Sequence, residues 1–214
     1  MKTYLRDNNS NNLIVFFCGW ALDERPFNVL ESKGFDVLFV YDYSNLNLSF
    51  DFSKYEKKVL VAFSYGVFIS SLIKEVLPEF DYKVAINGTF KPIDREFGIS
   101  EKIFDLTLNS VSEESMKKFY SRMFDNNLDD EYFTENLPLR FAEECKKELS
   151  LIKMHYEESK DISYGFDKAI VSLSDKIFPI KSQLNFWKNI MIREVEAGHF
   201  LFYKFNDFNE IIDL

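Results

Sequence analysis

The sequence predicts an α/β fold in which a mostly parallel sheet carries helices on both faces. Short apolar runs alternate with helical stretches through the first 90 residues, as strand and helix units around a parallel sheet do. This strand signal disappears between residues 91 and 161 and then resumes. A length of 214 residues suits one domain with an elaboration, and 46% hydrophobic residues with only 7 Gly and 5 Pro exclude a disordered chain.

Four apolar runs in the first 90 residues have the length and branching of strands buried in the middle of a sheet, and strand patterning resumes in two later runs. They span residues 13–17, 37–40, 59–63, 84–86, 169–173 and 190–195. Because four of these runs precede the segment 91–161 and two follow it, both flanking parts contribute to one sheet. We therefore expect an α/β core formed by residues 1–90 and 162–214, with residues 91–161 inserted as a helical lid.

Helical periodicity occurs between and after these runs. From Tyr65 the apolar period becomes that of a helix, which continues until Pro78. Its apolar face consists of Val67, Phe68, Leu72, Ile73 and Val76. The segment from about residue 91 to residue 156 predicts three or four amphipathic helices joined by acidic loops, and a last helical segment begins near residue 201.

Charge and cysteine content exclude several classes of protein. The chain has 26 Lys and Arg against 35 Asp and Glu, and a net charge of −9 argues against nucleic-acid binding, which needs clustered positive charge. The two cysteines, Cys18 and Cys145, form no Cys-x-x-Cys pair. We therefore expect neither a disulfide framework nor a metal or other cofactor.

The apolar runs are also too short for membrane insertion. None approaches the roughly 20 residues that a transmembrane helix requires, and residues 1–12 are polar and rich in asparagine, unlike a signal peptide. We therefore expect a cytoplasmic protein without a membrane partner. We also expect a monomer, because an acidic surface disfavours self-association.

Residues 59–66 place a serine where a strand passes directly into a helix. Ser64 follows the strand, and the small residues Ala62 and Gly66 stand two positions before and after it. This is the context of the nucleophile elbow of α/β hydrolases, in which a tight turn projects the serine oxygen above the sheet. The alternative interpretation is that Ser64 only caps the helix, a position that serine favours.

An acid and a histidine follow in the chain order that an α/β-hydrolase triad requires. Asp175 comes after the run 169–173, and His199 comes after the run 190–195. The other histidine, His155, lies among charged residues of the helical segment and suits a helix surface. Asp167 competes for the role of the acid, but it precedes its strand and would lie at the opposite edge of the sheet. We therefore predict catalysis by Ser64, Asp175 and His199.

An oxyanion hole needs two backbone donors near the serine. Tyr65, the residue after the nucleophile, supplies one by position. The loop after the run 13–17 contains Gly19 and would supply the other from the Trp20 amide. A Cys-His enzyme built on Cys18 is the weaker alternative, since Cys18 ends an apolar strand and suits a small buried side chain.

Several motifs resemble the BioG family. They are Phe-Phe-Cys-Gly-Trp at 16–20, Tyr-Asp-Tyr at 41–43, Val-Ala-Phe-Ser-Tyr-Gly-Val at 61–67, Asn-Gly-Thr at 87–89 and Gly-His-Phe at 198–200. The resemblance implies a short α/β hydrolase that removes the methyl group from pimeloyl-acyl-carrier-protein methyl ester in biotin synthesis. It implies no cofactor and an acyl carrier protein as partner.

Such a substrate needs an apolar tunnel for its seven-carbon chain. Five aromatic residues are candidates to line it: Trp20, Phe63, Tyr65, Phe119 and Phe141. The chain contains 24 Phe, 11 Tyr and 2 Trp, so any one of these five can instead belong to the core. Only Trp20 and Tyr65 are placed near the serine by the motif argument itself.

Docking of an acidic carrier protein would require a local basic patch, because residues 91–161 carry 11 basic and 17 acidic side chains. The candidates are Lys117, Lys118, Arg122, Arg140, Lys146, Lys147 and Lys153. Such residues also suit the solvated face of an amphipathic helix. Two other functions remain open: a general carboxylesterase or thioesterase on small acyl substrates, and a non-catalytic binding module on the same fold.

Overall fold

A computed structural model describes residues 1–159 and 162–214 and contains one seven-stranded sheet in the order β1-β3-β2-β4-β5-β6-β7. All neighbouring strands are parallel except β1 and β3. The strands are β1 (Lys2–Arg6), β2 (Asn12–Phe17), β3 (Asp36–Tyr41), β4 (Lys57–Phe63), β5 (Tyr82–Ile86), β6 (Lys168–Ser172) and β7 (Met191–Val195). Six of them match the predicted apolar runs to within two residues.

The strand β1 was not predicted. It pairs only with β3, in antiparallel register from Lys2 opposite Tyr41 to Arg6 opposite Val37. As an edge strand it leaves most of its side chains exposed, so its sequence contains no apolar run. Helix α6 (Ile180–Trp187) was also not predicted; it follows Pro179 and packs on β6 and β7.

Helix α1 (Tyr65–Leu72) packs against β2 and β4, as the change of period after Tyr65 predicts. The close approach depends on Gly66, because a Cβ atom there would lie 2.5 Å from the carbonyl oxygen of Phe17. The predicted helix up to Pro78 is broken at Ile73 into α1 and a short 3-10 turn, Lys74–Val76. The C-terminal segment likewise forms a 3-10 turn, Phe202–Lys204, and helix α7 (Phe208–Asp213).

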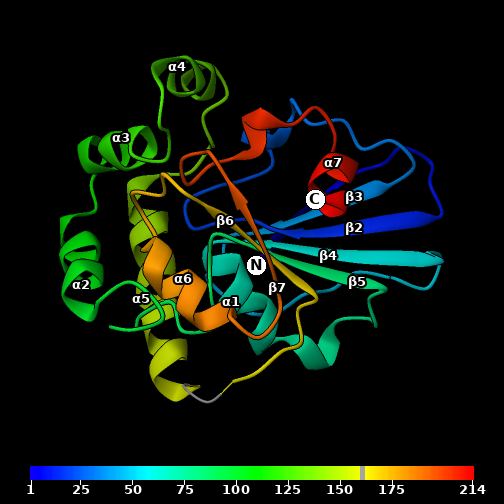
Figure 1. The fold of residues 1–214 in the computed structure, drawn as a ribbon, viewed down its shortest axis with the longest axis horizontal. Helices are drawn as coiled ribbons and strands as arrows, with labels where there is room; N and C mark the ends of the chain where they lie inside the picture. The colour runs from blue at the N-terminus through cyan, green and yellow to red at the C-terminus, as the bar shows by residue number, and fades with distance from the viewer. Residues whose placement is uncertain (160–161) are drawn as a thin grey trace.

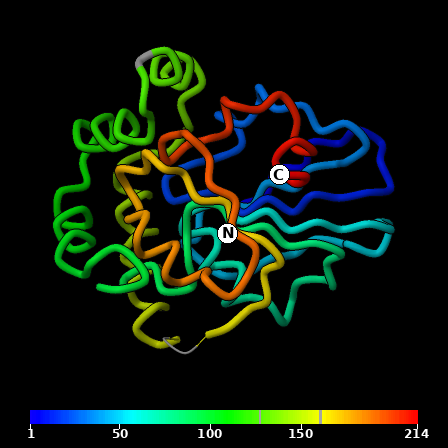
Figure 2. Tube along the Cα trace, in the orientation of Figure 1, coloured from blue at the N-terminus to red at the C-terminus, as the bar shows by residue number. Residues whose placement is uncertain are grey.

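Four helices lie between β5 and β6, within the predicted number. They are α2 (Glu101–Ser110), α3 (Glu113–Ser121), α4 (Asn127–Glu135) and α5 (Ala142–Glu158). We call residues 91–159 the inserted segment; its predicted end at residue 161 lies outside the described residues. Figure 1 shows its helices gathered at one end of the sheet. In Figure 2 the chain leaves the sheet for this green to yellow segment and returns to it in gold and orange.

Aromatic side chains fill much of the core. Phe16, on the central strand β2, is fully buried and its ring lies 4.6–5.6 Å from those of Phe27, Phe39, Phe202 and Phe208. Such tilted and edge-on pairs each add about 0.5–1.5 kcal/mol beyond the area that they bury. The C-terminal segment is therefore fixed to the first strands by aromatic packing. Among residues 1–159 and 162–214, no helix has the length and apolar character needed to cross a bilayer.

Candidate active site

Ser64 occupies a strained turn between β4 and α1. Its φ of 56° is in the left-handed region, which costs a residue other than glycine about 1–3 kcal/mol. The backbone N–H of Ser64 donates to the carbonyl of Ile86 on the neighbouring strand β5, at 2.8 Å. The Ser64 side chain makes no capping hydrogen bond to α1, so the helix-cap interpretation is wrong. The turn instead leaves Oγ available to other groups.

The structure brings Ser64, His199 and Asp175 together. Nε2 of His199 lies 3.0 Å from Oγ of Ser64, and Nδ1 of His199 lies 2.8 Å from Oδ2 of Asp175. All three side chains are buried or nearly so. They come from the loops that follow β4, β6 and β7, and the carboxyl ends of these parallel strands meet at one edge of the sheet. The arrangement can pass a proton from a serine hydroxyl to a histidine that a carboxylate orients.

Asp175 is held in place by three further donors. Its Oδ1 accepts from the backbone N–H groups of Ile177 and Phe178, both at 2.8 Å, and its Oδ2 accepts from Nε2 of Gln183 at 3.2 Å. The rival acid, Asp167, precedes β6 and accepts from the backbone N–H of Lys83 at 2.7 Å. It therefore lies at the opposite edge of the sheet, as its position in the sequence predicts.

A buried asparagine, Asn87, fixes the loop that carries His199. Its Nδ2 donates to the carbonyl of His199 at 2.7 Å and to Oγ of Ser172 at 2.8 Å, while its Oδ1 accepts from the N–H of Ser172 at 2.8 Å. Asn87 therefore connects the ends of β5 and β6 to the histidine loop. Reasoning from the sequence did not assign it this role, although it begins the Asn-Gly-Thr motif.

The same loop contacts the inserted segment. The N–H of Phe200 donates to the carbonyl of Met123 at 3.0 Å. Gly198 permits this approach, because a Cβ atom at that position would lie 2.5 Å from the Met123 oxygen. His155, by contrast, lies on α5 with Nδ1 3.7 Å from Glu158, which agrees with its expected place on a helix surface.

Two backbone N–H groups are available beside the serine. In the described part of the chain, neither the Trp20 nor the Tyr65 amide donates a hydrogen bond to a backbone or side-chain acceptor. Trp20 lies in the turn after β2 and Tyr65 is the first residue of α1. These are the two amides expected for an oxyanion hole. Burial raises the pKa of Cys18 well above its usual value, which opposes a role as thiolate nucleophile.

Two cavities share five lining residues; we call the smaller one, which Tyr65 lines, the inner cavity and the larger one the outer cavity. The inner one, of about 100 Å³, is lined by Tyr65, Phe104 and Leu149 among others, and the outer one, of about 350 Å³, lies between α2 and α3. Both are lined by Trp20, Ile103, Thr107, Phe119 and Arg122. The rings of Trp20 and Phe119 meet edge to face with their centroids 4.8 Å apart. Trp20, Tyr65 and Phe119, three of the five aromatic residues predicted to line an acyl tunnel, thus each line at least one of these cavities.

The other two aromatic candidates lie elsewhere. Phe63 is fully buried beneath the site, with its ring 4.9 Å from that of His199, and is not among the lining residues of either cavity. Phe141 is 71% exposed at the start of α5 and does not line them either. Their predicted contacts with an acyl chain are therefore corrected: Phe63 supports the histidine, and Phe141 faces solvent.

The basic candidates fall into three groups. Lys117, Lys118, Arg122, Lys146 and Lys147 are exposed on or beside α3 and α5. Lys153 is partly buried and its Nζ lies 2.6 Å from Oδ1 of Asp105 on α2. Arg140 is buried, with a side chain only 1% exposed and bonded to Glu148. The prediction that Arg140 docks a carrier protein is therefore wrong, because a surface partner cannot reach it.

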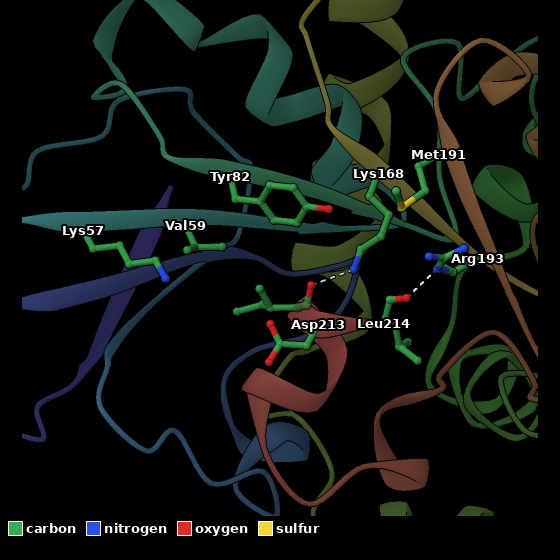
Figure 3. Close-up of a pocket in the computed structure, with 9 residues that line it drawn as sticks. Lys57, Val59, Tyr82, Lys168, Met191, Arg193, Asp213 and Leu214 are labelled. Atoms are coloured by element: carbon green, nitrogen blue, oxygen red, sulfur yellow. Dashed lines mark hydrogen bonds between the residues drawn. The ribbon is translucent and has the colours of Figure 1, made fainter.

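A third cavity, of about 390 Å³, lies at the amino edge of the sheet, away from the serine. Figure 3 shows Lys57, Tyr82, Lys168 and Arg193 around it, next to the C-terminal residue Leu214. Nζ of Lys168 donates to the carbonyl of Ile212 at 2.6 Å, and Arg193 donates to the carbonyl of Leu214. Two of these cations therefore hold the C-terminal helix α7 against the sheet.

Comparison with known proteins identifies the family. The profile described as "Pimeloyl-ACP methyl esterase BioG" matches residues 1–211. This chain belongs to the BioG family. The crystal structure of BioG from Haemophilus influenzae is 32% identical, covers 100% of both chains and superposes with a TM-score of 0.93.

A second relative of this BioG-family chain is longer. It is a malonyl-[acyl-carrier protein] O-methyltransferase from Bacteroides fragilis, 37% identical over 193 residues that make up 87% of this chain. The match covers 39% of that protein, so the chain spans about two fifths of its length. An esterase from Exiguobacterium antarcticum is 14% identical, covers 94% of this chain and 90% of its own, and has a TM-score of 0.66. That likeness shows the α/β-hydrolase fold.

Proposed function

We propose that this protein is a serine carboxylesterase that hydrolyses the methyl ester of pimeloyl-acyl-carrier protein, releasing methanol and the free pimeloyl-acyl-carrier protein. The observation that carries the proposal is the relay of 3.0 Å from Ser64 to His199 and 2.8 Å from His199 to Asp175. Membership of the BioG family supports this choice of substrate. The reaction would belong to biotin synthesis in the cytoplasm, and we expect the enzyme to act as a monomer without a cofactor.

In the first half of the reaction, Nε2 of His199 takes the proton from Oγ of Ser64 as that oxygen attacks the ester carbonyl. Asp175 keeps the imidazole in the tautomer that accepts at Nε2 and stabilises its positive charge. The carbonyl oxygen becomes an oxyanion, which the amides of Trp20 and Tyr65 would bind. His199 then gives its proton to the methoxy group, the carbon–oxygen bond breaks, and methanol leaves.

In the second half, water replaces methanol. His199 takes a proton from the water, whose oxygen attacks the acyl-serine carbonyl, and the same two amides stabilise the second oxyanion. Return of the proton to Oγ of Ser64 releases the free carboxylic acid, which ionises in water. Both halves use the same groups: His199 moves the proton, Asp175 orients it, and the two amides stabilise the oxyanion.

The cavities support a long apolar acyl chain. Trp20, Ile103 and Phe119 line both of them, and we propose that the two join in an apolar path from the Tyr65 end to the surface between α2 and α3. Lys118 and Arg122 line the outer cavity. This arrangement would suit the proposed substrate, because the charged carrier protein would lie outside the outer cavity and the uncharged methyl ester would lie inside. We propose that residues 91–161 form the lid of this path over a core of residues 1–90 and 162–214.

Docking of the carrier protein is proposed on the exposed basic residues of the lid. They are Lys117, Lys118 and Arg122 at α3 and Lys146 and Lys147 on α5. Lys118 and Arg122 line the outer cavity, so a carrier bound there could send its prosthetic arm inward. Lys153 is a weaker member, because Asp105 already neutralises it.

Replacement of the nucleophile tests the proposal. We expect Ser64→Ala to lower kcat on carrier-linked pimeloyl methyl ester by several orders of magnitude while the fold is retained, as loss of a triad member does in other serine hydrolases. A fluorophosphonate probe should label Ser64 in the parent protein and nothing in the variant. Retained activity, or labelling of another residue, would show that the serine assignment is wrong.

Substrate comparison separates the remaining functions. A general esterase or thioesterase would hydrolyse short nitrophenyl esters or acyl thioesters faster than the carrier-linked methyl ester. A non-catalytic module would hydrolyse none of them and resist the probe. Growth without biotin, restored by this gene in a cell that lacks its own methyl-ester-cleaving enzyme, supports the proposed role.

A further inference from the structure

We propose that the buried ion pair of Arg140 and Glu148 positions the oxyanion hole. We define the oxyanion loop as residues 18–23, the turn after β2 that contains the Trp20 amide. The proposal rests on the proposed function, since it concerns a donor assigned to the ester's oxyanion. The hydrogen bonds and ion pairs of the two side chains, among the described residues, include none with Ser64, Asp175 or His199; both would act through the backbone of this loop.

Glu148 reaches the loop from α5. Its side chain is 0% exposed, and its Oε1 accepts from the backbone N–H of Tyr43 at 2.9 Å. Tyr43 in turn donates from its hydroxyl to the carbonyl of Cys18 at 2.6 Å. Burial raises the pKa of Glu148, and the charge of Arg140 and the backbone N–H groups of Tyr43 and Ala21 oppose that rise. One carboxylate therefore faces the loop at Ala21 and, through Tyr43, at Cys18.

Arg140 approaches the same loop from the chain just before α5. Its Nη1 donates to the carbonyl of Leu22 at 3.1 Å, and its Nη2 donates to Oε2 of Glu148 at 2.9 Å. Oδ1 of Asp42 lies 3.5 Å from the same nitrogen. The guanidinium thus joins the loop, the carboxylate of α5 and the end of β3 in one network.

Other groups of the inserted segment complete these contacts. The indole N–H of Trp20 donates to the carbonyl of Cys145 at 2.7 Å, and the hydroxyl of Tyr120 donates to the carbonyl of Ala21 at 2.9 Å. The N–H of Leu139 donates to Oδ2 of Asp23 at 2.7 Å. Each residue from Trp20 to Asp23 is therefore in contact with the inserted segment.

The loop needs such support because its conformation is strained. Ala21 has φ 65°, in the left-handed region that alanine rarely adopts. An oxyanion donor must also lie within a few tenths of an ångström of its place to stabilise a transition state. A buried ion pair adds little net stability, because removing two charges from water offsets their attraction. The pair therefore serves to hold Trp20 in position rather than to stabilise the fold.

Three variants test the proposal on a short nitrophenyl ester, which involves no carrier protein. Glu148→Gln and Arg140→Lys keep the size of the side chains and weaken the pair. Asp105→Asn is the matched control, because it removes a different ion pair of the lid, Asp105 with Lys153, whose members make no hydrogen bond to the oxyanion loop among the described residues. Burst titration gives the number of active sites in each preparation, so that kcat is counted per folded, reactive molecule.

We expect kcat per active site to fall about tenfold to a hundredfold in Glu148→Gln, and less in Arg140→Lys, with KM changed by less than about twofold. Direct loss of an oxyanion donor costs about 10²–10³. The inhibition constant of a trifluoromethyl ketone, which forms a tetrahedral oxyanion on the serine, should rise by the same factor as kcat/KM falls. Asp105→Asn should leave all three quantities unchanged.

Unchanged kcat per active site in both variants would overturn the proposal and leave the pair with a purely structural role. If Glu148→Gln fails to fold, Arg140→Lys is the test: a melting temperature below that of the Asp105→Asn control, with a kcat per active site equal to the control's, would also overturn the proposal. Failure of the proposed function is distinct, because then the parent protein neither turns over the ester nor reacts with the probe.

Discussion

The sheet core and the inserted segment are stabilised in different ways. Most side chains of β2, β4 and β6 are buried. Aromatic rings packed against these strands join parts of the chain that are distant in sequence. In the inserted segment, α2 buries only Phe104 and α3 only Met116 and Tyr120, while Leu106 and Leu128 stay exposed. Helix α5 packs more deeply, since Cys145, Leu149 and Ile152 are buried in the same hydrophobic cluster as the strands.

This difference separates two tasks. Ser64, Asp175 and His199 come entirely from loops of the core, so their geometry depends on the register of parallel strands. In our proposal the inserted segment covers the acyl path and supports the oxyanion loop, so it would influence substrate and transition state without supplying a member of the proposed triad. Substitutions in the two regions should therefore have different effects on stability, turnover and carrier affinity.

The largest effect on kcat should come from substitution of Asp175, at the carboxyl edge of the sheet. We expect Asp175→Asn to lower kcat about 10⁴-fold with little loss of stability, because the amide favours the wrong tautomer of His199 while it fills the same space. Asp167→Asn is the matched control, at the opposite edge of the sheet. Steady-state kinetics on both variants measure the effect; an equal loss in Asp167→Asn would contradict the assignment of the acid.

Packing in the two regions can be compared with one substitution. Leu60, on β4, is 0% exposed and Leu106, on α2, is 58% exposed. We expect Leu60→Ala to lower the free energy of unfolding by about 2–5 kcal/mol and Leu106→Ala by less than about 0.5 kcal/mol. Urea denaturation measures both. Similar losses would show that the inserted segment packs as tightly as the core.

Substitution of Asn87, which holds the loop of His199, should have an effect of intermediate size. Asn87 has φ 48°, so Asn87→Gly removes its hydrogen bonds without backbone strain. We expect a loss of about 1–3 kcal/mol in the free energy of unfolding and a several-fold lower kcat, because the carbonyl of His199 and the N–H of Ser172 lose their partner.

Asn9→Gly provides the matched control for that loop, because Asn9 is exposed and also has a positive φ, of 58°. It should leave both the stability and kcat within measurement error. If the two variants behave alike, the hydrogen bonds of Asn87 do not position His199.

The smallest effect should come from the lid surface. We expect the double charge reversal Lys117→Glu with Lys118→Glu to raise KM for the carrier-linked ester about five- to tenfold and to leave kcat and the hydrolysis of a free ester unchanged. Lys33→Glu with Lys57→Glu makes the same change of charge at the amino edge, on two other exposed lysines. Equal effects on both substrates, or in both double variants, would exclude docking at α3.

The meeting of Ser64, Asp175 and His199 could be predicted from the sequence because it depends on local order. The sequence places Ser64 at the end of one strand, and an acid and a histidine beyond the ends of two later strands. In a parallel sheet these three strand ends lie at the same edge, so the three side chains can meet there. The strand β1 and the role of Asn87 could not be predicted in this way. An edge strand needs no apolar run, and the partners of Asn87 lie 85 and 112 residues away along the chain.

The sequence by itself determined the α/β class, the six central strands, the nucleophile elbow and the order of the acid and the histidine, because apolar periodicity and short motifs report on neighbours along the chain. Only the tertiary structure decided which charged and aromatic side chains are buried. It placed Arg140 inside, against Glu148, and Phe141 outside, although both precede the same helix. The physical reason is that burial depends on which distant segments pack against a residue, and no local pattern contains that information.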